Sequence, residues 1–223
     1  MDAPIAVSAV VERWLARGRP RQPRIIWPQL EWARAFPLHD PLWARLPSAL
    51  DREVIRDECH AAASSPDDAL VGFMAVMAWG YGSTGYGRYR VQLMMENGDA
   101  AERLYAVVQT LRDAGAVAAY DRFRTSARLV KLGPSFGTKF LAFCSKVEHP
   151  RALIFDAMVS KWLRENAGVR LVHERWHTRS YAEYLRLVHE WAEALGVEPD
   201  DVEFCMFAAE VAKRPGNHWA TGL

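Results

Sequence analysis

The 223-residue chain has few cysteines and no long hydrophobic run. Its three cysteines, Cys59, Cys144 and Cys205, are far apart and form no CxxC pair, so we expect buried, reduced thiols rather than disulfides or a metal site. Three are also too few for an iron–sulfur cluster held by four cysteines. No stretch approaches the roughly 18 apolar residues of a membrane span, and the N-terminus has no cleavage-like signal, which predicts a cytoplasmic protein with no membrane partner.

The histidines give little sign of a metal site. All seven are scattered, and His173 and His177 stand four residues apart, as two ligands on a helix would. With no nearby carboxylate-and-histidine set to complete a site, a solvated pair is the better interpretation. We therefore predict no metal and no cofactor.

Charge of either sign is nearly balanced, because the formal net charge is only +1. That value argues only against a uniformly basic nucleic-acid binder. Residues 13–24 nevertheless hold five arginines and no acid, residues 121–146 hold six basic residues against Asp121 alone, and acids gather at 51–58 and 198–203. One face of the molecule is therefore a candidate basic surface, although runs of charge also occur on ordinary solvated faces.

Strand patterns are also missing, whereas helical periodicity is found in nearly every segment, which predicts an all-α fold. A chain of this length can form one large domain or two packed lobes. The clearest amphipathic helix covers 180–195, with Ser180 as the expected N-cap and Gly196 as its end. Another begins at Asp99 and is expected to stop at Gly115, and the very apolar stretch 67–80 is expected in the core. Further helices are predicted at about 5–17, 48–63, 87–96, 116–127, 136–145, 157–166 and 199–213.

The N-terminal part is broken by prolines and rich in tryptophan. Its four prolines between residues 20 and 37 and its tryptophans Trp27, Trp32 and Trp43 indicate a short irregular segment. We predict that residues 1–47 form an arm packed on a helical domain of residues 48–223. The one extended candidate in that domain is "ALIF" at 152–155, directly ahead of Asp156.

The stretch "KLGPSFGTK" at 131–139 places two glycines around the start of a helix. A glycine turn that opens a helix leaves backbone N–H groups unpaired, and the helix dipole adds positive charge there, which suits a phosphate. With the basic run before it, one candidate is a phosphate of nucleic acid, contacted without reading sequence. The alternative is an ordinary helical hairpin whose glycines allow close packing. The candidate phosphate-binding residues are Lys131, Gly133, Ser135 and Gly137.

Asp156 follows the apolar stretch and precedes "AMVSKWL", where it is well placed to cap the next helix. A cap keeps the carboxylate ionised and fixes its direction. A purely structural cap is common, so the aspartate becomes interesting only because it lies so close in sequence to the glycine turn.

This order of glycine hairpin, helix with a lysine, apolar residues, aspartate and helix resembles the helix-hairpin-helix family of DNA glycosylases. Three segments resemble bacterial proteins described as 8-oxoguanine-glycosylase-like: "LGPSFGTKFLAF", "ALIFDAMVSKWL" and "YAEYLRLVHEWAEALGVEPDDVEFCMF". The resemblance runs from about residue 67 to 213 and is most specific at 131–163. It implies a helix-hairpin-helix helical bundle in which hairpin amides hold a DNA phosphate and Asp156 assists cleavage of the N-glycosidic bond.

Two registers of this resemblance assign the lysine differently. If Gly137 is the second hairpin glycine, "GTK" matches the bifunctional enzymes and Lys139 takes the place of their Schiff-base lysine. If Gly133 is that glycine, Ser135 takes the nucleophile position and Lys139 lies one turn further on, in reach of a phosphate. The first register fits the distance to Asp156 better, whereas the second keeps the glycine–proline pair and needs an insertion. We favour Lys139 as a catalytic residue together with Asp156.

A glycine-rich loop, "WGYGSTGYGRYR" at 79–90, carries aromatic and basic residues together. Tyr81 and Tyr86 are candidates for a wedge that fills the gap left by an extruded base, with Arg88 and Arg90 contacting phosphates. The alternative is an interhelical loop whose tyrosines pack on the core, and the sequence does not separate the two.

Trp176 and Trp219 are the candidates for a base pocket, the latter because a tryptophan in a polar C-terminal tail has no obvious core to join. The resemblance predicts a monomeric glycosylase that excises an oxidised or otherwise modified base from double-stranded DNA, in repair or in defence against phages with modified DNA. AP-lyase activity is expected if Lys139 is the nucleophile. The alternative is a non-catalytic helix-hairpin-helix module that binds DNA or a protein.

Overall fold

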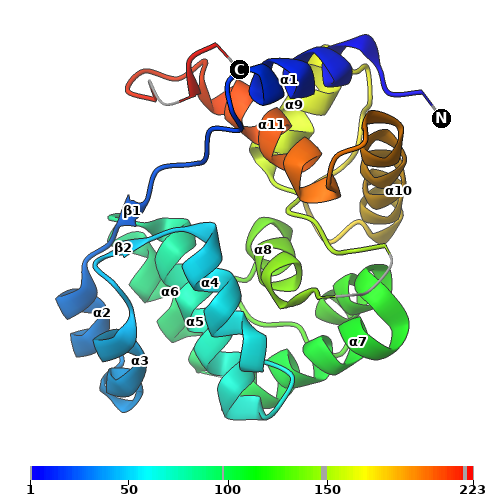
Figure 1. Ribbon diagram of the computed structural model, residues 1–223. Helices are drawn as coiled ribbons and strands as arrows, with labels where there is room; N and C mark the ends of the chain where they lie inside the picture. The colour runs from blue at the N-terminus through cyan, green and yellow to red at the C-terminus, as the bar shows by residue number, and fades with distance from the viewer. Residues whose placement is uncertain (1, 97, 147–149, 218–219, 223) are drawn as a thin grey trace.

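The computed structural model describes residues 2–96, 98–146, 150–217 and 220–222. In this part of the chain about 66% of the structure is helical, and the strands are two short segments. The elements form two lobes, one above the other in Figure 1, joined by extended segments. The predicted all-α fold is therefore confirmed.

The lower lobe of Figure 1 is built around one buried helix, α5 (Pro66–Tyr81). Every residue of α5 from Gly72 to Trp79 is buried, as its apolar sequence predicts. Ser65 caps the helix by accepting a hydrogen bond from the Asp68 amide. α5 contacts the short 3-10 helix η2 (Cys59–Ala61) and the helices α4 (Arg52–Glu58), α6 (Tyr86–Met95), α7 (Ala100–Arg124) and α8 (Pro134–Cys144).

The upper lobe brings together the two ends of the chain (Figure 1). α11 (Pro199–Val211) contacts all three other helices of this lobe. Nine of its residues are buried, namely seven apolar residues and the two glutamates Glu203 and Glu210. The helices around it are α1 (Ile5–Ala16), α9 (Ala157–Asn166) and α10 (Thr178–Leu195).

The N-terminal 47 residues are shared between the lobes. α1 packs on α11, whereas the segment after it crosses to the lower lobe and pairs there, Ile25 with Leu50, in an antiparallel ladder. Trp27, Trp32 and Trp43 form a buried cluster with ring centroids 5.6–5.8 Å apart. The elements concerned are β1 (Ile25–Ile26), α2 (Gln29–Ala35), η1 (Pro37–His39), α3 (Asp40–Arg45), β2 (Ala49–Leu50) and, after α4, η2 (Cys59–Ala61). The division into domains at residue 47 stays a prediction.

The helix that follows Asp99 ends at Gly115, as predicted. Gly115 has a non-helical backbone (φ 82°), which glycine tolerates, and a second helical stretch continues beyond it, so α7 is two helices joined across a kink. The start of α10 needs correction, because this helix is capped by His177 rather than by Ser180. The His177 ring accepts a hydrogen bond from the Ser180 amide, while the Ser180 hydroxyl accepts one from the Val172 amide.

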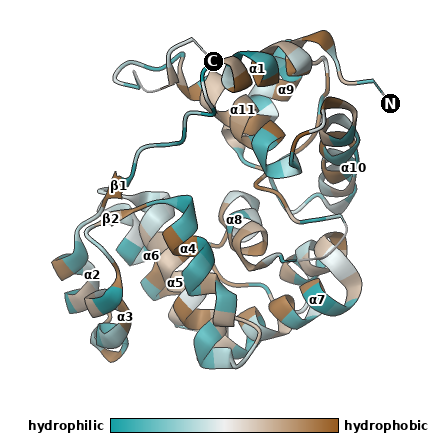
Figure 2. Cartoon of the chain, in the orientation of Figure 1, coloured by the Kyte–Doolittle hydropathy of each residue, from teal (hydrophilic) through white to brown (hydrophobic). Residues whose placement is uncertain are grey.

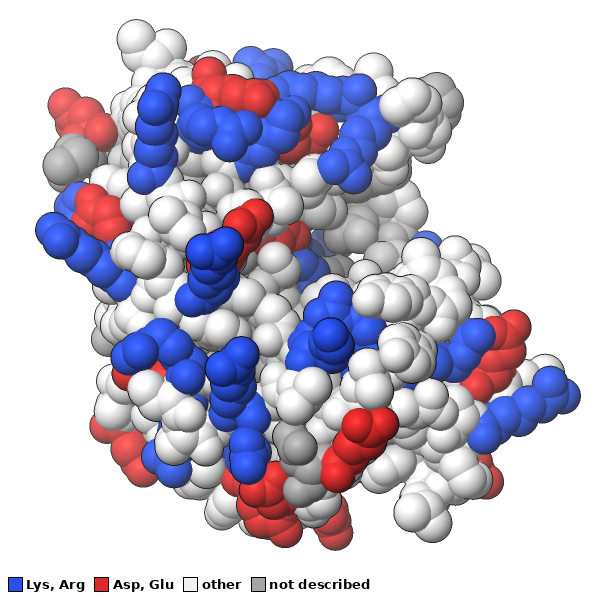
Figure 3. Space-filling view, turned by 180° about the vertical axis from the view of Figure 1, so that it is seen from behind, with Lys and Arg blue, Asp and Glu red and all other residues white. Residues whose placement is uncertain are grey.

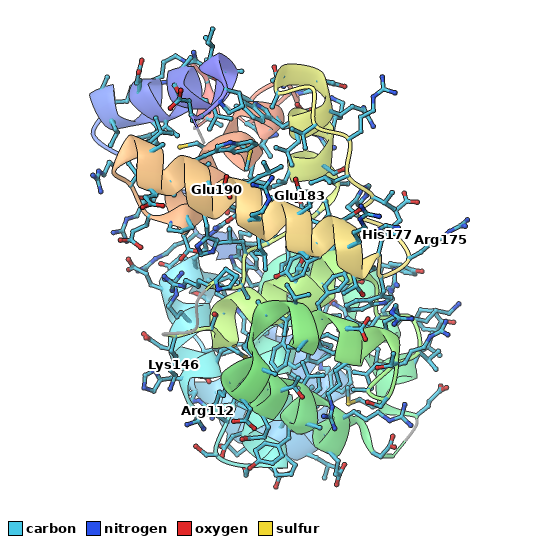
Figure 4. The ribbon with its side chains drawn as sticks, turned by 90° about the vertical axis from the view of Figure 1, so that its right-hand side faces the viewer. Arg112, Lys146, Arg175, His177, Glu183 and Glu190 are labelled. Carbon is cyan, nitrogen blue, oxygen red and sulfur yellow. The ribbon has the colours of Figure 1, made fainter. Side chains whose placement is uncertain are left out.

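α10 is amphipathic, with one buried side and one charged side. Its colouring mixes apolar and polar residues around the helix (Figure 2), and its apolar side buries Tyr181, Tyr184 and Trp191. Its outward side carries Glu183 and Glu190, and His177 lies at the beginning of the helix (Figure 4). Both glutamates pair with Arg186, so this face is a solvated ion-pair surface.

Within the described residues, no helix has both the length and the apolar character that a membrane crossing requires.

Candidate active site

The stretch from Ala152 to Phe155 delivers Asp156 to the junction of the lobes. All four residues are buried. The Tyr181 and Tyr184 hydroxyls donate hydrogen bonds of 3.1 and 2.8 Å to the carbonyls of Leu153 and Ile154. Burial raises the pKa of both tyrosines, which keeps them neutral donors. The apolar stretch therefore works as a fixed support rather than as a strand.

Asp156 caps α9, as predicted from the sequence. Its Oδ1 accepts hydrogen bonds from the amides of Met158 (3.0 Å) and Val159 (3.2 Å). Burial alone would favour the neutral acid, but the Lys139 ammonium and these two amides outweigh it and hold the pKa of Asp156 below its ordinary value. The group is thus a carboxylate with one oxygen fixed by the helix.

The other oxygen of Asp156 faces a lysine from the opposite lobe. Lys139 Nζ on α8 lies 2.8 Å from Asp156 Oδ2, and both side chains are 13% exposed. The ammonium also lies 5.6 Å from the centroid of the Phe136 ring. The Thr138 hydroxyl accepts a hydrogen bond from the Phe155 amide (3.1 Å), which ties α8 to the residue just before Asp156. Neighbouring residues on α8 thus set the distance between the two charges.

The ion pair lines a cavity of about 170 Å³. The remaining walls come from both lobes and from the segment that connects them: Gln22, Ile25, Arg52, Trp79, Gly80, Ile154 and Phe207. The cavity thus presents a buried carboxylate and an ammonium beside aromatic and polar walls, which is a suitable environment for holding a flat polar molecule.

A larger cavity of about 560 Å³ adjoins it and shares Gln22, Arg52 and Trp79 with it. Charged side chains of both signs line this second cavity, among them Arg24, Asp51, Arg56, Arg151 and Asp200. From behind, Figure 3 shows a hollow between the lobes with basic side chains above and below it.

A second buried ion pair spans the same junction. Arg52 of α4 holds Glu203 of α11 through two hydrogen bonds of 2.7 and 3.1 Å, and the Glu203 side chain is 1% exposed. Its guanidinium lies 5.4 to 6.0 Å from the ring centroids of Trp79, Phe204 and Phe207. Burial raises the pKa of Glu203 despite this partner. Within the described residues, and unlike Asp156, the Glu203 carboxylate accepts no hydrogen bond from a backbone amide at a helix start.

The two glycines of the 131–139 turn have different surroundings. Gly133 is the N-cap of α8, and a Cβ built there would meet none of the described atoms within 4 Å. Gly137 lies inside the first turn of α8, where a Cβ would stand 2.2 Å from the Trp176 ring. Lys131 is exposed with a left-handed backbone (φ 65°), and Ser135 is half-buried at the start of the helix. Lys139 rather than Ser135 lies against Asp156.

The glycine-rich loop divides its candidates between the two interpretations. Tyr81 is half-buried and stacks on Phe136 with centroids 4.3 Å apart, so it packs on α8. Tyr86 is 57% exposed. Arg90 lies 5.6 Å from the Tyr86 ring and donates a hydrogen bond to the Lys131 carbonyl, which joins the loop to the glycine turn. Arg88 pairs instead with Glu31.

Trp176 belongs to an aromatic cluster and lines neither of the two cavities. Its ring centroid lies 5.0 Å from that of Tyr120 and 5.1 Å from that of Phe123. The same ring packs directly against Gly137. Arg175 beside it projects outward from the loop before α10 (Figure 4). The other predicted pocket residue, Trp219, lies outside the described residues.

The structure describes all three cysteines and both histidines of the 173–177 pair. Cys59, Cys144 and Cys205 are buried and form no disulfide. His177 is exposed and His173 is partly so. Where the structure describes the chain, it places no three His, Cys, Asp or Glu residues so that they could hold a metal ion.

Comparison with known families gives one match. A family model described as "Putative 8-oxoguanine DNA glycosylase OGG-like protein" matches residues 18–207. The chain belongs to this family. No curated protein and no solved structure matches it. The family is thus the one predicted from the sequence, and its description points to a DNA glycosylase whose substrate is DNA.

Several cavity residues were not predicted from the sequence. Gln22 and Arg52 lie in segments noted only for their charge or helical pattern, and Trp79 lies near the end of a helix expected in the core. They lie far apart along the chain, and no local spacing connects them. A pattern of an arginine next to a helix-capping aspartate, as in Asp51 and Arg52, is too common to signal a site.

Proposed function

We propose that the protein excises a modified base from double-stranded DNA, with Lys139 and Asp156 as the reacting residues. The single observation that carries this proposal is the 2.8 Å pair between Lys139 Nζ and Asp156 Oδ2 at the wall of a cavity that opens between the lobes. In a family of DNA glycosylases, a buried lysine and carboxylate at one cavity suit cleavage of a bond to a sugar carbon.

The chemistry follows from where charge develops. As the bond between C1′ and the base nitrogen breaks, its electron pair leaves with the base and positive charge grows on the sugar. The ionised Asp156, with Oδ1 held by two amides, stabilises that charge without reorganising. Lys139 must give up a proton before Nζ can bond to C1′, and the departing base is the group that gains one. The covalent sugar adduct then allows strand cleavage.

Access to the cavity requires the base to leave the duplex. Extrusion costs a few kcal/mol, and a damaged or poorly paired base reduces that cost. We propose that Tyr86, exposed beside the glycine turn, fills the gap, and that Lys131, Gly133 and the Ser135 amide contact phosphates. Tyr81, Arg88 and Gly137 then act by packing, since each already has a partner within the fold.

The test is mass spectrometry of bases released from a panel of duplexes, each with one oxidised, alkylated or hypermodified base. The wild type is expected to release one class of base. Borohydride added during the reaction is expected to trap a DNA adduct whose peptide maps to Lys139, and Lys139→Gln should form none. Release without an adduct would leave Asp156 acting through water and remove the lyase step. If no duplex loses a base while DNA still binds, the protein is a non-catalytic binding module.

A further inference from the structure

The segment between α1 and β1 places one polar side chain over the catalytic cavity. It crosses from the upper to the lower lobe (Figure 1) and is held to the start of α4 by ion pairs of Arg21 with Glu53 and Arg24 with Asp51. Between them Gln22 lines both the smaller and the larger cavity. Its Oε1 is buried and has no hydrogen-bond partner in the described residues.

A matching donor lies in the same walls. Arg52 also lines both cavities, and its two terminal nitrogens are occupied by Glu203. Its Nε–H is buried and, within the described residues, has no partner. A buried donor or acceptor without a partner is unfavourable, and here the two atoms belong to side chains that line the same cavity, which suits a ligand that supplies both partners. The guanidinium cannot swing away, because Glu203 and three aromatic rings fix it.

The aromatic walls indicate the shape of that ligand. Trp79 lines both cavities and is held by an edge contact to Phe143 at 5.2 Å between centroids, and Phe207 lines the smaller one. Flat rigid walls together with a few polar groups suit a planar ring that is read along one edge.

We infer that Gln22 and Arg52 read the pairing edge of the extruded base, and that the enzyme takes bases whose modification lies elsewhere on the ring. A hydrogen-bond donor next to an acceptor is what the pairing edge of a nucleobase presents. Gln22 Oε1 accepts from the donor, and Arg52 Nε–H donates to the acceptor. A base alkylated on that edge loses the donor and leaves Gln22 unpaired. This inference rests on the proposed function.

The experiment is a double-mutant cycle that combines a substitution in the protein with a methylation of the base. The probe is the panel duplex from which the wild type releases a base, compared with the same duplex methylated at the pairing-edge nitrogen: N1 for 8-oxoguanine, N3 for 5-hydroxyuracil. In the wild type, methylation should lower kcat/KM roughly 10- to 100-fold. Gln22→Leu should lose about 10-fold on the unmethylated base and little on the methylated one. Arg21→Gln is the control for the segment, because Arg21 is 78% exposed and pairs on the surface.

Each outcome of this experiment either supports or overturns the base-reading role of Gln22. A methylation effect that shrinks in Gln22→Leu but not in Arg21→Gln supports the base-reading role. An equal loss on both bases means that Gln22 supports the segment only, and an unchanged rate means that it contacts no base. Either result overturns the inference while base release by the wild type leaves the proposed function intact. If the wild type releases no base and binds no modified duplex better than an unmodified one, the proposed function fails and this inference with it.

Discussion

Two buried ion pairs cross the junction of the lobes, and they are built differently. In each, a cation from the lower lobe meets a carboxylate from the upper one: Lys139 with Asp156, and Arg52 with Glu203. Asp156 accepts hydrogen bonds from two helix amides and has a lowered pKa, whereas burial raises the pKa of Glu203. A lysine can lose a proton and bond to carbon, and an arginine cannot. The Lys139–Asp156 pair is therefore suited to take part in a reaction, and the Arg52–Glu203 pair is suited to hold the two lobes together.

The sharpest way to break this comparison is to remove each cation in turn. Lys139→Gln should lower the rate of base release by about 10²- to 10⁴-fold, because the reacting nitrogen is gone. Single-turnover kinetics on the duplex that the wild type cleaves gives the rate. Lys139→Arg is the matched variant, since it keeps the charge but cannot react, and it should be as slow. A Lys139→Arg enzyme with wild-type rates would mean that only charge matters at this position.

Removing the other cation should affect stability first. Arg52→Met leaves Glu203 buried without its partner and should lower the free energy of unfolding by about 3–5 kcal/mol. The double change Arg52→Met with Glu203→Leu should restore most of it, because two apolar side chains replace two charges. Urea unfolding of the three proteins measures this. No recovery in the double variant would mean that the pair does more than satisfy its own charges.

The position of α8, which carries Lys139, depends on the glycine that Trp176 covers. Gly137→Ala would place a Cβ 2.2 Å from that ring and should lower stability by about 1–3 kcal/mol and shift the lysine. Gly133→Ala is the control, since a Cβ there meets no described atom and its φ of −99° suits alanine. Thermal unfolding and base release should both separate the two variants. Similar behaviour of the two would contradict the packing account of the turn.

The two carboxylates should respond to pH in opposite directions. The folded pKa of Asp156 is depressed, so its stabilisation is present above its unfolded value of about 4 and is lost as pH falls through the lower folded value. The folded pKa of Glu203 is raised, so its stabilisation is present below the unfolded value and is lost as pH rises through the folded one. Unfolding free energies of Asp156→Asn and Glu203→Gln, each relative to the wild type, should therefore change with opposite slopes in mild acid. Parallel slopes would contradict the assignment.

The sequence predicts the positions of Asp156 and Lys139 better than it predicts the cavity around them. The cap at Asp156 and the helix carrying Lys139 follow from local patterns within 25 residues. The walls do not, because Gln22, Arg52 and Phe207 come from three distant segments that only tertiary packing brings together. The sequence also left two roles open for Gly137, since a packing glycine and a turn glycine look alike until the facing ring is known.

One comparison tests the central claim most directly: base release and DNA affinity of the wild type and of Asp156→Asn on the same duplex. Asparagine keeps the shape and still offers an oxygen to the Met158 and Val159 amides, but it has no charge to stabilise the sugar. We expect excision to fall by at least about 100-fold while the dissociation constant for the duplex stays within a few-fold of the wild type. Excision at the wild-type rate would contradict the assignment of Asp156, and with it the distinction between the two ion pairs.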